Sequence, residues 1–168
     1  MIKARRLAAL LPFLGLALAL VPTRAIAGVD LDGGVRAAIF DENYKLGVGG
    51  ELGVIAPAAA LWDLGLHLNY THFKSKTETL DDATELGGYV AAYYKPALDQ
   101  GFSLRLGPHI GYSELEGHFL DLGGDVMAVF KITPALSFYG AFIPSFLIGS
   151  DTQSLFRIGL GLEYHTGS

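Results

Sequence analysis

The sequence predicts an all-β protein, an eight-stranded antiparallel up-and-down β-barrel that spans a membrane. Three observations support this fold class. The chain begins with the pattern of an export signal. Its mean hydropathy is +0.36, yet no later apolar stretch reaches the roughly 20 residues of a membrane-spanning helix. Eight segments instead alternate apolar and polar residues. A closed barrel satisfies every backbone group within lipid without any helix, so it accommodates all three observations.

Residues 1–27 have the three parts of a secretory signal peptide. The start is positively charged, Leu7–Val21 is apolar but interrupted by a proline, and Ala25-Ile26-Ala27 has the small-x-small pattern that precedes cleavage. We expect cleavage after Ala27, and residues 28–168 to form one barrel domain. An uncleaved anchor helix is the alternative, but the apolar run is short for it.

The composition of residues 28–168 excludes several classes of function. Four of the chain's 12 basic residues lie in the first 27, so 8 basic residues remain against 17 acidic ones and the net charge is −9. This acidic balance, with no basic patch, argues against nucleic acid as a partner. The chain has no cysteine, and therefore no disulfide and no thiolate chemistry.

The predicted strands follow one another with turn signals between them. In chain order they cover about residues 29–40, 46–56, 62–71, 84–95, 102–112, 118–131, 136–148 and 154–164. Most are about as long as the roughly 9–11 residues that a tilted strand needs to cross a bilayer.

Alternation is cleanest in the third, fifth and eighth strands. The third strand has Trp62, Leu64, Leu66, Leu68 and Tyr70 on one face and Asp63, Gly65, His67, Asn69 and Thr71 on the other. The fifth and eighth repeat this pattern over 102–112 and 156–164, and the other five follow it less cleanly.

The connections support the same topology. Those after the first, third, fifth and seventh strands hold most of the loop charge, whereas the others carry Pro57, Pro96 and Pro134. If the N-terminus is periplasmic, the charged connections point outward.

The polar face is expected to point into the barrel. That face is rich in glycine, which suits the crowded lumen of eight strands but not an open surface. A soluble lipocalin-like barrel, apolar inside and polar outside, is the alternative. Aromatic residues at the ends of the apolar face favour two membrane girdles; they are Trp62, Tyr70, Phe102, Tyr112 and Tyr164.

With these eight segments, residues 28–168 resemble the small outer-membrane barrels of Gram-negative bacteria typified by the transmembrane domains of OmpA, OmpX and OmpW. The most specific match is the last strand, in which Arg157, Gly159, Leu162 and Tyr164 resemble the signal read by the barrel-assembly machinery. The chain departs from that pattern because it continues for four residues after the aromatic one.

The resemblance implies a place in the outer membrane of the cell and several partners. These are the barrel-assembly machinery and periplasmic chaperones during biogenesis, and outer-membrane lipids including lipopolysaccharide. His72, Lys74 and Lys76 rise into the longest loop, where they would contact lipopolysaccharide phosphates or simply be solvated. Eight strands favour a monomer.

Charged and polar residues of both signs are predicted to fill the lumen. The set is Arg36, Glu51, Asp63, His67, Glu85, Arg105, His109, Asp121, Asp125, Arg157 and Glu163. Charges in a narrow lumen must pair to offset the cost of burial. We therefore expect a salt-bridged plug in a non-enzymatic structural protein. A narrow pore is the alternative, and it would favour cations because carboxylates outnumber bases.

A lipid A-modifying enzyme is a less favoured alternative. The His-x-Ser pair expected on one strand of a deacylase-like barrel is absent, since no histidine is followed by serine two positions later. Symmetric hairpins would place His109, Asp121 and Ser145 in one inward row, but with the acid in the middle, whereas a catalytic triad needs the histidine there. No metal site and no cofactor are expected, because no ligand spacing or phosphate loop occurs.

Two prolines fall within predicted strands. Pro108 and Pro144 each lie six residues after a phenylalanine near the start of their strand, so they are expected at similar depth on the lipid face, flanking the sixth strand. A closed barrel has no edge at which to place a missing N–H donor. Each proline therefore marks a β-bulge or a lateral opening, through which a small apolar molecule could pass into the membrane.

Overall fold

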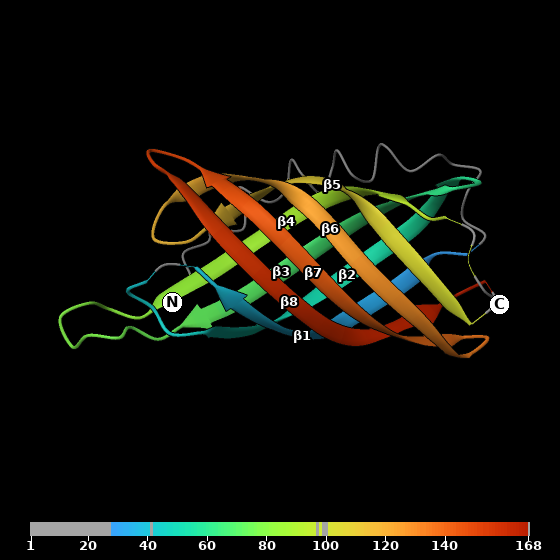
Figure 1. The fold of residues 1–168 in the computed structure, drawn as a ribbon, viewed down its shortest axis with the longest axis horizontal. Helices are drawn as coiled ribbons and strands as arrows, with labels where there is room; N and C mark the ends of the chain where they lie inside the picture. Colours follow the sequence, from blue (N-terminus) through green and yellow to red (C-terminus); the bar gives the residue numbers. More distant parts are fainter. Residues whose placement is uncertain (1–27, 41, 97, 99–100, 168) are drawn as a thin grey trace.

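The computed structural model describes residues 28–40, 42–96, 98 and 101–167, so the predicted signal peptide lies outside the described residues. Within them, eight strands form a closed antiparallel barrel in which each strand pairs with the next and the last with the first (Figure 1). The strands are β1 (Asp30–Ile39), β2 (Gly47–Ala59), β3 (Trp62–Phe73), β4 (Ala83–Tyr94), β5 (Phe102–Glu114), β6 (His118–Thr133), β7 (Leu136–Ile148) and β8 (Thr152–His165). The predicted eight-stranded antiparallel up-and-down barrel is confirmed. No helix in the described part of the chain is long and apolar enough to cross a bilayer.

The expected strand boundaries hold to within about three residues, with one informative difference. Pro57 was expected in a turn but lies within β2, which continues to Ala59. The pairing of β2 with β3 shifts register between Pro57 and Ala59, so this proline occupies an irregular strand end where a ladder donor is not required. The turn itself is residues 60–61.

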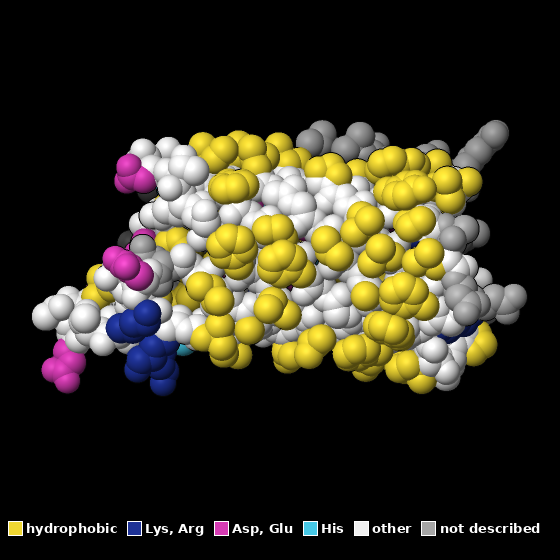
Figure 2. All heavy atoms as spheres, in the orientation of Figure 1, with side chains coloured by type: hydrophobic (Ala, Val, Ile, Leu, Met, Phe, Trp, Pro, Cys, Tyr) yellow, Lys and Arg dark blue, Asp and Glu magenta, His cyan; other side chains and the backbone are white. Residues whose placement is uncertain are grey.

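The two ends of the barrel differ. One end, here called the terminal end, holds the start of β1, the end of β8 and short connections such as residues 134–135. The opposite loop end holds the connection between β3 and β4, which extends to the left in Figure 1. In Figure 2 acidic and basic side chains gather mainly at the loop end, while the wall between the two ends is hydrophobic.

The barrel is apolar outside and polar inside. Outward side chains such as Leu52 and Val35 are 68% and 65% exposed, whereas the inward Arg36 and Arg157 are buried. This distribution is the reverse of a soluble barrel, so the lipocalin-like alternative is wrong. The protein has the polarity of a barrel that meets lipid along its whole circumference.

The predicted girdle residues lie on the outer face near both ends. At the terminal end the Trp62 ring packs 5.6 Å from that of Tyr94, and the Phe102 ring 4.9 Å from that of Phe130. Tyr164 is exposed at the same end. Tyr70 is exposed towards the loop end, and Tyr112 hydrogen-bonds His118 there. The partners Tyr94 and Phe130 were not predicted as part of the girdle.

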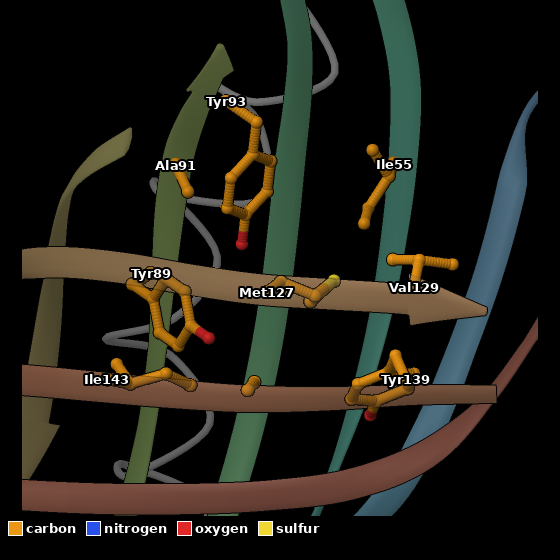
Figure 3. Packing of buried hydrophobic residues seen from close by; sticks show 9 residues of the cluster. Ile55, Tyr89, Ala91, Tyr93, Met127, Val129, Tyr139 and Ile143 are labelled. Atoms are coloured by element: carbon orange, nitrogen blue, oxygen red, sulfur yellow. The ribbon is translucent and has the colours of Figure 1, made fainter. Parts of the chain in front are cut away.

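Apolar side chains also occupy parts of the lumen, which the sequence analysis did not predict. A middle cluster, shown in Figure 3, points inward from β2, β4, β6 and β7, and includes Tyr89, Tyr93, Met127 and Tyr139. A second cluster, here called the apolar cap, stands at the loop end. The cap comprises Ala38, Tyr44, Phe73, Ala83, Leu115, Phe119, Leu147 and Leu155, with Phe40 against it.

Inward glycines make room for these contents, as expected. A Cβ on Gly159 would lie 2.9 Å from Glu51 Oε1, and one on Gly53 would lie 2.6 Å from Asp32 Oδ1. Both distances are too short for a carbon atom, so a side chain at either position would push the carboxylate aside.

Candidate functional site: the polar lumen

The lumen residues predicted from the sequence all point inward, and none of the eleven is more than 4% exposed. They are joined in three layers along the barrel axis. Each layer contains one arginine, and each arginine has at least one carboxylate partner.

The layer at the terminal end is centred on Arg105 of β5. Its guanidinium donates to Glu163, to Asp30 Oδ2 at 2.7 Å and to Asp63 Oδ2 at 3.1 Å. Lys95 Nζ reaches the second oxygen of Asp63 at 3.0 Å. One cation therefore ties strands β1, β3, β5 and β8 together across the lumen.

The middle layer joins Arg36 to Glu51, which also accepts a 3.0 Å hydrogen bond from the Tyr139 hydroxyl. On the other side of the lumen, the Tyr93 hydroxyl donates to Asp125 Oδ2 at 2.7 Å and lies 2.9 Å from His67 Nε2. Tyrosine hydroxyls thus bridge positions that paired charges alone would leave unsatisfied.

The third layer, towards the loop end, is centred on Arg157 of β8. Its Nη2 donates to Glu85 Oε1 and Asp121 Oδ2, both at 2.6 Å, and its Nη1 to Ser145 Oγ at 2.6 Å. Asn69 adds a 2.7 Å hydrogen bond to Glu85. These bonds link β3, β4, β6, β7 and β8.

His109 occupies the centre of the expected inward row, and the expectation that the acid would be central is wrong. Its Nε2 lies 3.1 Å from Ser145 Oγ and 3.2 Å from Asp121 Oδ1, while its Nδ1 bonds Asp125. The hairpin is offset, because His109 pairs with Gly123 rather than with Asp121. Side chains on either side of Gly123 in β6 therefore converge on one imidazole.

The order of atoms at His109 is that of a serine triad, but its surroundings are those of a packed interior. Ser145 Oγ accepts the hydrogen bond from Arg157, and all three groups of the row are buried. Neither His109 nor Ser145 lines any of the three cavities described for the chain. The arrangement can orient a proton, and all of its groups lie within the packed interior.

The terminal end of the lumen opens into a cavity of about 360 Å³. Its polar lining comes from the Arg105 layer, including Asp30, Lys95 and Glu163, and continues to His165. At the opposite end the apolar cap stands across the lumen between the Arg157 layer and the loops. Polar access to the interior is thus more open from the terminal end.

Sequence reasoning missed the group that lines this cavity. Asp30, Glu163 and His165 place one potential ligand atom each within 4.8 Å of one another. No spacing signal could reveal them, because Asp30 and His165 are 135 positions apart in the chain and meet only when β1 pairs with β8.

The two prolines do not lie at bulges, so the bulge alternative is wrong. β4 and β5 pair in the same register on both sides of Pro108, but Ala92 and Tyr93 of β4 have no paired residue on β5. Pairing between β6 and β7 likewise keeps its register around Pro144, while Gly124 has no partner on β7. Each proline therefore interrupts a ladder without displacing it.

The prolines lie at one depth, as expected. Pro108 pairs laterally with Gly124, which stands opposite Pro144 in the β7 register. The two interruptions fall on opposite sides of the β5–β6 pair, whose own ladder is continuous from Phe102 to Glu114. Pro108, Gly124 and Pro144 thus form a row across the outer wall, in which each residue lacks either a backbone N–H donor or a side chain.

The remaining predicted positions are divided between the two faces. In the candidate assembly signal, Arg157 is buried in the lumen, and Leu162 and Tyr164 are exposed on the outer wall. At the loop rim, Lys76 Nζ donates to the Glu42 carbonyl at 2.7 Å and His72 lies 3.5 Å from Asp82. These two rim side chains are held by the protein itself.

The sequence matches no protein-family model and no curated protein. The structure is similar to solved barrels. Ail of Yersinia pestis is 16% identical with a TM-score of 0.58, over 83% of this chain and 98% of that one. Neisserial surface protein A is 13% identical with a TM-score of 0.55, over 82% and 95%. A major outer membrane protein from Thermus thermophilus is 14% identical with a TM-score of 0.56, over 82% and 99%. The predicted resemblance to small eight-stranded outer-membrane barrels is confirmed at the level of the fold.

Proposed function

We propose that this protein is an integral outer-membrane barrel that is non-enzymatic and structural, with a lumen that does not conduct ions steadily. One observation carries this proposal: the arginine–carboxylate bonds of the Arg105 and Arg157 layers cross the lumen, and the apolar cap stands above them. Between these layers, Glu51 is bonded to Arg36 of the neighbouring strand and to Tyr139 across the lumen. An ion entering the lumen would have to separate buried pairs, which costs several kcal/mol for each uncompensated charge.

Membrane insertion is supported by the outer wall and by the fold. Large apolar side chains cover the wall, and the strands are 10 to 16 residues long, enough to cross a bilayer when tilted. The similar barrels include proteins described as outer-membrane proteins. We place the terminal end in the periplasm, because the charged loops lie at the other end.

The proposed partners follow from this location. Outer-membrane lipids would surround the wall, and an outward hollow of about 470 Å³ over β1 to β4, lined by Gly33, Gly50, Leu52 and Leu68, could accept an acyl chain of lipopolysaccharide. The barrel-assembly machinery would read the β8 signal, and periplasmic chaperones would carry the unfolded chain. We propose a monomer, because each described strand edge is already paired.

The test is conductance across a planar lipid bilayer. Purified protein, refolded into vesicles and fused with the bilayer, is expected to give no steady current steps, while a general porin prepared in the same way gives them. Steady steps that scale with the amount of this protein would overturn the plugged lumen and support a narrow pore. Cation selectivity of those steps would identify the lumen carboxylates as its lining.

A second function, lateral passage of a small apolar molecule, is favoured by the interrupted ladders at Pro108 and Pro144. Where strands lack cross-strand hydrogen bonds, they separate at lower cost than elsewhere in a barrel. Uptake of an apolar fluorescent dye into vesicles tests this role. Faster uptake than by empty vesicles, lost in Pro108→Ala/Pro144→Ala, would support passage. Equal uptake in all three preparations would exclude it.

A further inference from the structure

We propose that Asp30, Glu163 and His165 form a binding site for a divalent transition-metal ion, best matched by Zn²⁺, at the seam where the barrel closes. The ligand set is one imidazole nitrogen and two carboxylate oxygens, all within 4.8 Å of one another. Zinc sites with an open position commonly use three such protein ligands and a water. The site is independent of whether the barrel conducts.

The fold brings these residues together by register. Asp30 is the first residue of β1 and pairs directly with His165, the last residue of β8. Glu163 lies two residues before His165 on the same strand, so it shares the same inward face. Closure of the barrel therefore creates the site, and the unfolded chain does not contain it.

The ligand atoms already face one point. His165 Nδ1 lies 2.8 Å from Asp30 Oδ1 and 3.7 Å from Glu163 Oε1. The other ring nitrogen, Nε2, bonds Ser137 Oγ at 2.7 Å. A hydroxyl on the far nitrogen fixes the orientation of a metal-ligating imidazole, and leaves Nδ1 for the metal.

A separate observation points to a missing partner at this place. Glu163 Oε1 is buried and has no hydrogen-bond partner among the described atoms, although Glu163 is 0% exposed. A carboxylate oxygen without a partner in the interior is costly. This orphaned oxygen is the one that faces His165 Nδ1.

Arg105 orients the same two carboxylates from behind. Its guanidinium donates to Asp30 Oδ2 and to Glu163 Oε2. The remaining oxygen of each carboxylate, Asp30 Oδ1 and Glu163 Oε1, therefore faces His165. Hydrogen-bonded carboxylates of this kind are typical of metal sites. The adjoining cavity of about 360 Å³ supplies an entry path and room for a water ligand.

The donor set selects the class of ion. Mg²⁺ and Ca²⁺ prefer six or more oxygen ligands, and this group offers two carboxylates. An imidazole with carboxylates suits zinc, copper or nickel, of which zinc has no demand for planar or octahedral geometry. The competing explanation is a protonated His165 that simply forms an ion pair with Asp30 and Glu163.

The experiment is calorimetric titration of ZnCl₂ into untagged, chelator-treated protein refolded in detergent micelles. We expect one equivalent to bind, with affinity lowered about 10- to 100-fold in Ser137→Ala, the positioning residue, and more in His165→Gln. His118→Gln is the matched control, since it makes the same change on an exposed histidine at the loop end and is expected to bind like wild type.

A second measurement separates metal ligation from a structural ion pair. In nitrogen NMR of the wild-type protein, Zn²⁺ is expected to shift His165 Nδ1 while Nε2 keeps its hydrogen-bonded position, and heat-modifiable gel migration verifies that each variant is folded. Binding of less than one equivalent by wild type, or unchanged affinity in folded His165→Gln, would overturn the proposal. Neither result bears on whether the lumen conducts ions, so the metal-site proposal can be wrong while the proposed function is right.

Discussion

Arg157 on β8 and Glu85 on β4 are hydrogen-bonded to each other across the lumen, with Nη2 2.6 Å from Oε1. Their strands are four places apart around the wall in either direction, so they stand on opposite sides of the barrel. Asp121 of β6 shares the same Nη2 at 2.6 Å. Both side chains of the cross-lumen pair are fully buried, and the pair acts as a strut for the whole loop half.

Replacing Arg157 by methionine is expected to lower the free energy of unfolding by about 3–5 kcal/mol, because Glu85 and Asp121 would remain buried without their cation. Urea unfolding in lipid vesicles, followed by the fluorescence of Trp62, the chain's single tryptophan, measures this. Lys74→Met, on an exposed loop, is the control and should change little. The triple variant with Glu85→Gln and Asp121→Asn should regain much of the loss. If Arg157→Met unfolds with the same free energy as wild type, the Arg157–Glu85 pair does not stabilise the barrel.

Opening the apolar cap alone is expected to leave the barrel silent in a planar bilayer. Leu147→Ala/Leu155→Ala removes two buried cap side chains, but the Arg157 layer beneath it still crosses the lumen. Adding Arg157→Ala is also expected to give no steady steps, because the Arg36 and Arg105 layers and the middle cluster still fill the lumen. Current through the double variant would show instead that the cap is the main barrier.

Restoring an N–H donor at Pro144 is expected to protect Gly124 from hydrogen exchange. In the wild-type protein Gly124 lacks a β7 partner, so its amide should exchange faster than that of Leu122, which pairs with Phe146. The restored N–H would donate to a carbonyl of β6 and hold β6 and β7 together. One added hydrogen bond contributes about 0.5–1.5 kcal/mol, so exchange at Gly124 should become roughly 2- to 10-fold slower in Pro144→Ala. Exchange measured in bilayers checks this. Equal protection of Gly124 and Leu122 in the wild type would show that the interruption at Pro144 does not weaken the pairing of β6 with β7.

A charge on the outer wall is expected to be costly only if the wall faces lipid. Leu160 on β8 is 51% exposed and Leu98 in the β4–β5 connection is 50% exposed. If both positions faced water, replacing either leucine by arginine would change the folding free energy by about the same amount. Within a bilayer, Leu160→Arg should lose about 2–4 kcal/mol of folding free energy and Leu98→Arg about 0–1 kcal/mol. Equal losses in vesicles would argue against membrane insertion.

Removing the hydroxyl of Ser145 is expected to leave lipid A chemically unchanged. Ser145 is held between His109 and Arg157 in the packed interior, where it completes a hydrogen-bond chain. The mass spectrum of lipid A from cells expressing wild type, Ser145→Ala or no barrel should therefore be the same. A mass difference that appears with wild type and disappears with Ser145→Ala would identify an acyl-transfer or hydrolase site instead.

Strand alternation was sufficient to predict the topology and the face of each lumen residue, because a period of two fixes orientation wherever one face meets lipid. The inward arginines, carboxylates and histidines are buried as expected. The pairs they form were not predictable in the same way. His109, for example, contacts Asp121, Asp125 and Ser145 and is itself the central residue, where Asp121 was expected. An offset of two residues between strands changes the neighbours without changing the face.

The order of amino acids alone was enough to establish that the chain is a barrel, which side chains point inward, and where two prolines deprive a ladder of donors. It took the folded arrangement to show which charges pair, that an apolar cap stands at the loop end, and that Asp30 and His165 meet at the closing seam. Orientation within a strand is a local property of the backbone, whereas register, stagger and closure depend on contacts between strands far apart in the chain.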